Sequence, residues 1–366
     1  MELGTAAAGP GELDRGHLAV TDLPTGGPER LPVVVAEGER AGPTLWVTAS
    51  IHGDEHTGLA AAQDVMVESL PGRLCGTVVC LPALNPAGLR RSARASYYHD
   101  DDPNRQFPDP AGERHRPPKV QELIAERLYE RVAASADVLL DLHTAHVGSV
   151  PFVIRDRVLH GDQRDEQAAA ALAEDLAGVV DATGLPVVNE YPAEEYVGRS
   201  LQRSMAGAAL NGAGVPACTF ELGSHSVVEE DTRALGVRGV YGVMQHLDMV
   251  DAIPEDVDAA DGPYEPPVDY PVRRFRGPRT PEAGILRHRV AAGDAVEAGD
   301  VVADVVTATG EQVTSVAAEH DGYVLGRAGV TAYENDPVAS MAVRDEGDLV
   351  VPRDADEAAD GSGSGR

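Results

Sequence analysis

Lysine is almost missing from this sequence. Lys119 is the single lysine among 366 residues, so nearly all of the positive charge is arginine, and the formal net charge at pH 7 is −30. No basic stripe is present that could neutralise phosphates, which argues against a nucleic-acid partner. Acidic residues are spread from Glu2 to Asp360, and such a surface keeps a protein soluble in concentrated salt. We therefore interpret the chain as the product of a halophile.

Cysteines and long apolar segments are also scarce. The three cysteines, Cys75, Cys80 and Cys218, lie in or beside apolar runs of strand length, so we expect buried, reduced thiols. No apolar run approaches the roughly 20 residues that span a membrane. Residues 1–16 lack the apolar core of a signal peptide. These absences predict a cytoplasmic protein without a membrane partner.

Apolar runs of strand length alternate with helical segments over the first 250 residues. Apolar strands that alternate with helices indicate an α/β fold with a mixed, largely parallel sheet flanked by helices. Strands are expected at 17–23, 31–36, 44–49, 76–82, 138–144, 151–154, 184–188 and 215–223, and helices at 57–70, 119–135, 165–180, 200–210 and 238–250.

The composition changes after this α/β unit. We assign residues 1–255 to a catalytic domain and the stretch 256–270, rich in Asp and Pro, to a linker. Residues 271–352 alternate short β runs with Gly-Asp turns, which predicts a small all-β domain. The acidic and Gly/Ser-rich segment 353–366 is expected to be disordered.

The segment 50–58, Ser-Ile-His-Gly-Asp-Glu-His-Thr-Gly, joins the strand 44–49 to the following helix. In an α/β sheet, such a corner lies at the carboxyl edge of the strands, where ligands usually bind. Because Gly53 relaxes the backbone between them, His52 and Glu55 can face a common point as two zinc ligands.

A third metal ligand is expected from the strand 138–144, which ends in His143 at the same edge of the sheet. Asp141 lies on the same face of this strand and can orient a ligand. His146 is a weaker alternative because it falls beyond the strand. Two His and one Glu leave a fourth position open, which is the pattern of catalytic and not structural zinc.

Two further features point to the chemistry. Glu221 follows Phe220 in a buried strand, and a buried carboxylate is costly unless it has a partner or a role. The long loop 87–118 concentrates arginines in an otherwise acidic chain. These arginines either bind a substrate carboxylate or pair with the aspartates at 100–102, and the residues alone leave both interpretations open.

Together these motifs resemble the succinylglutamate desuccinylase/aspartoacylase family. The resemblance covers about residues 30–350 and implies a zinc amidohydrolase with a carboxypeptidase-like α/β domain and a C-terminal β domain of barrel-sandwich type. The motifs that carry it, in the order of the family, are His52-Gly53-Asp54-Glu55, Asn85-Pro86, Arg94, Asp102-Pro103-Asn104-Arg105-Gln106-Phe107-Pro108, Asp141-Leu142-His143 and Phe220-Glu221-Leu222-Gly223.

The resemblance implies a role for each matching residue. His52, Glu55 and His143 would hold one zinc ion per chain, and Glu221 would act as general base and then as acid. Asn104 and Arg105 match the pair that binds the substrate carboxylate, and Arg94 matches the arginine that polarises the scissile carbonyl.

The sequence departs from the family pattern at Pro103 and in the spacer between Arg94 and Asn104, which carries Tyr97-Tyr98-His99 and three aspartates. Pro103 stands where the family usually has Leu. The further arginine that some members place ahead of the catalytic Glu has no clear counterpart, and Arg199 and Arg203 are the candidates.

These observations predict the hydrolysis of the amide bond of a small N-acyl amino acid or a related N-acyl amine. A zinc metallocarboxypeptidase that acts on short peptides, with Arg105 at the terminal carboxylate, is the alternative enzyme. A ligand-binding relative without activity is a third interpretation. The β domain also resembles lipoyl and biotinyl carriers, but these need a lysine at a hairpin tip, which this domain lacks.

The residues do not identify the acyl group or the amine. An acylated diaminobutyrate would suit a halophile, on habitat alone. A homo-oligomer is compatible with the sequence but is not required by it.

Overall fold

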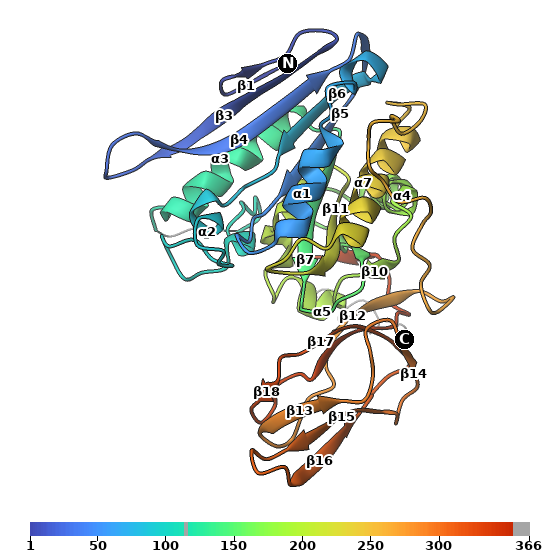
Figure 1. The fold of residues 1–366 in the computed structure, drawn as a ribbon. Coiled ribbons are helices and arrows are strands. Elements are labelled where there is room, and N and C mark those ends of the chain that lie inside the picture. The colour runs from blue at the N-terminus through green and yellow to red at the C-terminus, as the bar shows by residue number, and fades with distance from the viewer. Residues whose placement is uncertain (113–115, 354–366) are drawn as a thin grey trace, which may run out of the picture.

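The structure is a computed structural model that describes residues 1–112 and 116–353. It consists of an α/β part and a smaller C-terminal β part (Figure 1). The tail predicted to be disordered lies outside the described residues, except for Arg353. Among the described residues, none of the helices combines the length and the apolar character needed to cross a membrane.

One large sheet organises the α/β part. Within the described residues its strand order is β14-β17-β19-β12-β10-β8-β11-β7-β5-β6-β4-β3. In the α/β part its strands are β3 (Glu12–Asp22), β4 (Pro28–Glu37), β5 (Arg40–Ala49), β6 (Cys75–Leu81), β7 (Val138–Ala145), β8 (Phe152–Arg155), β10 (Val187–Asn189) and β11 (Ala217–Ser224). The short strands β1 (Glu2–Leu3) and β2 (Ala6–Ala7) form a separate pair.

The centre of the large sheet is parallel. Strand β5 runs parallel to β6 and β7, and β7 runs parallel to β11. Strand β8 is antiparallel to β11 but parallel to β10. The predicted mixed, largely parallel sheet is therefore confirmed, and the carboxyl ends of β5, β7 and β11 meet at one edge.

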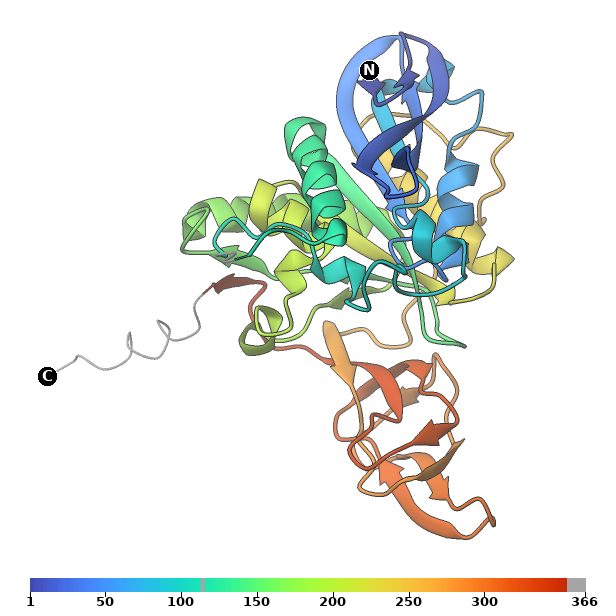
Figure 2. The ribbon, with the colours of Figure 1, turned by 90° about the vertical axis from the view of Figure 1, so that its left-hand side faces the viewer.

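Helices cover both faces of the sheet. Helices α1 (His56–Val65), α4 (Glu166–Ala182) and α7 (Glu230–His246) lie on one face, and α3 (Val120–Ser135) lies on the other, as Figures 1 and 2 show. Trp46 is fully buried, and its Nε1 donates to Ser135 Oγ at 3.1 Å. The short helical pieces are α2 (Pro86–Leu89), α5 (Ala193–Tyr196), α6 (Met205–Ala208), η1 (Pro71–Arg73), η2 (Pro103–Arg105), η3 (Leu201–Arg203) and η4 (Ala209–Ala213).

Helix α7 begins eight residues before the predicted start. Gly236 and Gly239 lower the helix propensity of this segment, which conceals its first two turns in the sequence. Both glycines are required by packing. A Cβ at Gly236 would lie 2.5 Å from Leu222 Cδ1, and one at Gly239 would lie 2.7 Å from Phe220 Cε1. A larger residue at either position would therefore require side chains of β11 to shift.

Two other predicted helices differ from the structure. Helix α1 ends at Val65 and not at residue 70, because the backbone of Met66 leaves the helical conformation, with φ −91° and ψ 63°. The predicted helix 200–210 consists of η3, α6 and the start of η4. Ser204 ends η3 and caps α6 by accepting from the Gly207 N–H at 2.9 Å, so one helix is divided into short pieces.

The C-terminal part is built from strands β12 (Val272–Arg276), β13 (Gly284–His288), β14 (Ala295–Val296), β15 (Val301–Val306), β16 (Gln312–Ala317), β17 (Gly322–Arg327), β18 (Thr331–Ala332) and β19 (Ala339–Arg344). The strands β16-β15-β13-β18 form a second sheet, which packs on a core of its own. The limits of this part as an independent domain stay a prediction.

The C-terminal part is joined to the α/β part at both ends. Strand β12 pairs in parallel with β10, so the large sheet continues across the linker. Strand β20 (Val350–Pro352) returns and pairs with β9 (Val158–His160). Buried Arg157 binds Asp345 at 3.0 Å, and Arg353 binds Asp109 at 2.6 Å. The strands that follow the linker are therefore fixed against the edge where the central strands end.

Candidate active site

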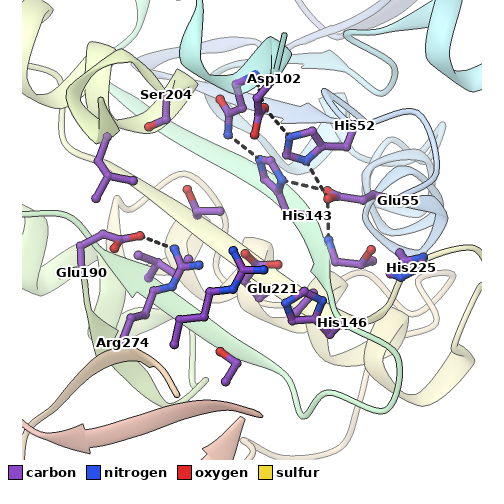
Figure 3. A pocket seen from close by; sticks show the side chains of 18 of the residues that line it. His52, Glu55, Asp102, His143, His146, Glu190, Ser204, Glu221, His225 and Arg274 are labelled. Carbon is purple, nitrogen blue, oxygen red and sulfur yellow. Dashed lines mark hydrogen bonds and ion pairs between the residues drawn. The ribbon is translucent and has the colours of Figure 1, made fainter. Parts of the chain in front are cut away.

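A cavity of about 740 Å³ opens at the carboxyl ends of the central strands (Figure 3). It collects every residue that the sequence assigned to the site, although these come from five separate segments of the chain. They are His52, Glu55, Arg94, Asn104, Arg105, His143 and Glu221.

Three of these residues form a buried triad. His52 Nδ1 lies 2.7 Å from Glu55 Oε1, and His143 Nδ1 lies 2.8 Å from Glu55 Oε2. One ligand atom from each residue lies within 4.8 Å of the others, and in the described part of the chain no other group of His, Cys, Asp and Glu is so placed. The triad is the metal site predicted from the sequence.

An aspartate contacts each imidazole at Nε2, on the side of the ring away from Glu55. Asp102 Oδ1 lies 3.0 Å from His52 Nε2, and Asp141 Oδ2 lies 2.7 Å from His143 Nε2. Both Nδ1 atoms therefore face Glu55, and an outer partner of this kind is usual for histidines that bind metal. The structure confirms the predicted contact of Asp141, whereas the contact of Asp102 was not predicted.

The local backbone brings His52 and Glu55 together. Ser50, directly after β5, has a positive φ of 53° and turns the chain. Gly53 then passes so close to α2 that a Cβ would lie 2.1 Å from the Gly88 carbonyl carbon. Glu55 precedes α1, and the Thr144 N–H donates to its Oε2 at 3.2 Å. The glycine of the motif is thus required by close packing, whereas the positive φ of this corner lies at Ser50 and not at Gly53.

Electrostatics keep the triad suited to a cation. Burial opposes ionisation of Glu55, but His52 and His143 hold the pKa of that carboxyl well below its usual range. Glu55 therefore stays ionised, as a metal ligand must. Two imidazoles with fixed rings and one carboxylate fit a divalent ion of the zinc class.

Glu221 lies beside the triad without belonging to it. Strands β11 and β7 are parallel neighbours, and Glu221 is paired with His143 in their register. Within the described residues, no donor reaches the buried Oε2 atom of Glu221. Burial raises the pKa of Glu221, the Glu55 carboxylate adds to this, and His143 opposes it. The site thus has a carboxyl group that is free to exchange protons next to a metal ligand.

Three arginines of the loop 87–118 differ in whether they have an acidic partner. Arg90 binds Glu29 at 3.0 Å, and Arg94 binds Asp102 at 3.0 Å, so both have acidic partners. Arg105 donates to the Asn104 carbonyl at 2.6 Å and has no acidic partner among the described residues. The guanidinium of Arg105, which lines the cavity, can therefore bind a substrate anion.

Asn104 is held next to the triad by two contacts. Its Oδ1 accepts from the Met205 N–H at 2.7 Å, and its Nδ2 lies 3.4 Å from His143 Nε2. Of the other candidates, His146 and Arg199 line the cavity but lie outside the triad. Arg203 does not line it, since its Nε donates to the Phe107 carbonyl at 3.2 Å.

The sequence also matches a known family model. Residues 41–247 match the succinylglutamate desuccinylase/aspartoacylase catalytic domain, and this match covers more than half of the chain. The chain belongs to the succinylglutamate desuccinylase/aspartoacylase family. It is an amidohydrolase, a deacylase with a His-Glu-His metal site.

Two relatives of this family cover most of the chain. An N-alpha-acetyl-L-2,4-diaminobutyric acid deacetylase of Halomonas elongata is 28% identical over 305 residues, which are 81% of this chain and 80% of that protein. A succinylglutamate desuccinylase/aspartoacylase of Rhodobacter sphaeroides has a similar structure, with a TM-score of 0.71 and 21% identity over 92% of this chain and 96% of that one.

A second solved structure has a bound product. The ectoine utilization protein of Ruegeria pomeroyi in its product-bound form gives a TM-score of 0.69 and 21% identity, over 93% of this chain and 98% of that one. At this identity, both structural likenesses show the shared fold alone.

Several residues of the cavity were not found from the sequence. Asp156 and Glu190 line it, as do Arg274 and Arg276 from beyond the linker. Asp156 and Glu190 each follow the last residue of a strand, which is the signal that could have found them. The arginines lie within β12, and only its pairing with β10 shows that this strand reaches the cavity.

Proposed function

We propose that this chain is a zinc-dependent deacylase that hydrolyses the amide bond of an N-acetylated diaminobutyrate or a closely related N-acyl amino acid. The observation that carries the proposal is Glu221 beside the His52–Glu55–His143 triad, with an Oε2 that no donor of residues 1–112 and 116–353 reaches. The identity of 28% to a diaminobutyrate deacetylase supports the choice of substrate.

The triad would hold one zinc ion per chain, and a zinc ion bound there would polarise the amide carbonyl and lower the pKa of water. Glu221 takes the proton of the attacking water and delivers it to the leaving nitrogen. Its raised pKa suits both transfers. Asp102 and Asp141 keep the imidazoles in place during the reaction.

The remaining site residues bind and polarise the substrate. Arg105, to which the described part of the chain offers no acidic partner, receives the substrate carboxylate. Asn104 forms the wall between Arg105 and His143. Arg94, whose Nη1 lies 3.4 Å from Glu55, stands beside the triad, and we assign it to the carbonyl oxygen.

The position of the C-terminal part favours a small substrate over a polypeptide. Ser340 of β19 and Arg276 of β12 line the cavity together with the triad. Strands that follow the linker thus form part of its wall. This arrangement supports a deacylase over the alternative, a metallocarboxypeptidase.

The test of this function is a substrate panel in high salt. We expect the zinc-loaded protein to hydrolyse N-acetylated amino acids, with acetyl-diaminobutyrate among the best, and to leave short peptides almost untouched. Acetate release and the appearance of free amine measure the rates. Turnover of short peptides with none of N-acetyl, N-succinyl or N-aspartyl substrates would establish the carboxypeptidase instead.

Replacement of Arg105 by Lys should raise KM by about 10-fold or more for substrates with a free carboxylate. A guanidinium holds a carboxylate through two parallel hydrogen bonds, and an ammonium group does not reproduce this geometry. KM for an N-acetyl amino acid is compared with KM for its amide. Arg91→Lys is the matched control, since Arg91 is exposed and lies outside the cavity. An unchanged KM in a folded Arg105→Lys protein would give Arg105 a structural role only.

A further inference from the structure

Two carboxylates lie side by side in the wall of the cavity away from the triad. Strands β8 and β10 are parallel neighbours, with Arg155 paired with Asn189. Asp156 and Glu190 directly follow these two paired residues. They therefore lie beside each other, just beyond the ends of β8 and β10. Both are at least 95% buried, and both line the cavity. Figure 3 shows Glu190 and Arg274 across the cavity from His52 and Glu55.

Of these two carboxylates, Glu190 already has its partners. Its Oε2 accepts from the Tyr191 N–H at 2.9 Å, and its Oε1 accepts from the guanidinium of half-buried Arg274. The charge of Glu190 is therefore compensated within the protein.

Asp156 has a hydrogen bond but no cation. Tyr196 Oη donates to its Oδ1 at 2.7 Å, and Asn211 Nδ2 in turn donates to Tyr196 Oη at 3.2 Å, so the carboxyl group is held in one position. Among the described residues, Asp156 forms no ion pair with Lys, Arg or His, although its side chain is buried. Burial of a carboxylate without a cationic partner is costly, and a cation bound in the cavity beside Asp156 would offset that cost.

We propose that Asp156 is a specificity-determining residue, which binds the free ammonium group of an N-acylated diamino acid. The inference rests on the proposed function and refines it. The substrate carboxylate lies toward Arg105, the acyl amide lies at the triad, and the ammonium group lies at Asp156. The cavity therefore selects a cationic side chain over the acidic groups of acyl-aspartate or succinyl-glutamate.

The charges around Asp156 give this selection a pH dependence. Burial and the charge of Glu190 raise the pKa of Asp156 to about 7, while Tyr196, Arg105 and Arg274 act in the opposite direction. Below its pKa the carboxyl group is neutral and attracts an ammonium group weakly. The preference for a cationic substrate should therefore be full above about pH 8 and should fall as the pH drops below about 7.

The experiment compares two substrates that differ only in the ammonium group. Nα-acetyl-L-2,4-diaminobutyrate carries it, and N-acetyl-L-2-aminobutyrate does not. The wild-type ratio of kcat/KM for these substrates should be about 10 to 100, since a hydrogen bond to a charged group is worth that factor. Because the ratio is taken within one protein, general losses of activity and the catalytic ionisations cancel.

Asp156→Asn should bring this ratio close to one, because an amide keeps the bond from Tyr196 but carries no charge. Glu194→Gln is the matched control. Glu194 is an exposed acid on α5, the helix that carries Tyr196, and should leave the ratio unchanged.

Two results would overturn the inference alone: a wild-type ratio near one, or an Asp156→Asn protein that keeps the wild-type ratio. If Asp156→Asn does not fold, the wild-type ratio between about pH 6 and pH 9 decides, and a constant ratio overturns the proposal. Failure of the wild-type protein to hydrolyse any N-acyl amino acid would instead overturn the proposed function itself.

Discussion

Glu221→Gln is expected to lower kcat by about 10²–10⁴ and to leave the metal content unchanged. Glutamine has the shape of glutamate but cannot accept the proton of the attacking water. The metal should stay because Glu221 lies on β11, while the triad comes from the β5–α1 corner and from β7. Substrate binding should survive as well, since the change leaves Arg105 and the triad intact.

The measurement pairs zinc per chain with kcat for the same preparation. Glu319→Gln, an exposed change in the C-terminal part, is the control and should behave as the wild-type protein. If Glu221→Gln loses its metal, Glu221 is a ligand and the general base lies elsewhere. Turnover close to that of the wild-type protein would equally remove Glu221 from proton transfer.

Glu55→Gln should abolish metal binding and activity together. The carboxylate of Glu55 contacts Nδ1 of both histidines, so its charge is the one anionic ligand of the triad. An amide offers a neutral oxygen in its place and binds a divalent ion far more weakly. Zinc content should fall from about one per chain to near zero, with activity at the background rate. A chelator should have the same effect on the wild-type protein, and added zinc should reverse it.

His143→Ala and His146→Ala form the matched pair for this site. His143 belongs to the triad, whereas His146 lines the cavity outside it. We expect the first variant to lose zinc and the second to keep it. If the His146→Ala protein is the one that loses its metal, the third ligand has been assigned to the wrong histidine.

The metal site could be predicted because each ligand lies at a position that the sequence makes visible. Apolar runs identify β5 and β7 as buried strands. His52 follows the first run, and His143 lies at the end of the second. Parallel strands end at the same edge of a sheet, so His52 and His143 meet although they are far apart in the chain. Asp141 could be predicted as well, because residues two apart in a strand share one face.

The opposite wall of the cavity could not be predicted, since it depends on how the strands pair. Nothing local in the sequence says that β10 lies between β8 and β12, and only this order brings Asp156 and Glu190 close to Arg274. The contact of Asp102 with His52 depends on the path of an irregular loop, which no periodicity encodes. The start of α7 could not be predicted for a related reason. Gly236 lowers the helix propensity of the segment, and its close contact with Leu222 is visible only in the structure.

Because the large sheet continues across the linker, residues that follow the catalytic segment also line the substrate cavity. The match to the family's catalytic domain ends at residue 247, yet Arg274 and Arg276 enter the cavity from β12, which lies after that point. A recombination that exchanged the segment after the linker would leave the His-Glu-His triad intact and bring new charges into the cavity. Comparison of the catalytic segments alone therefore leaves out residues that line the cavity.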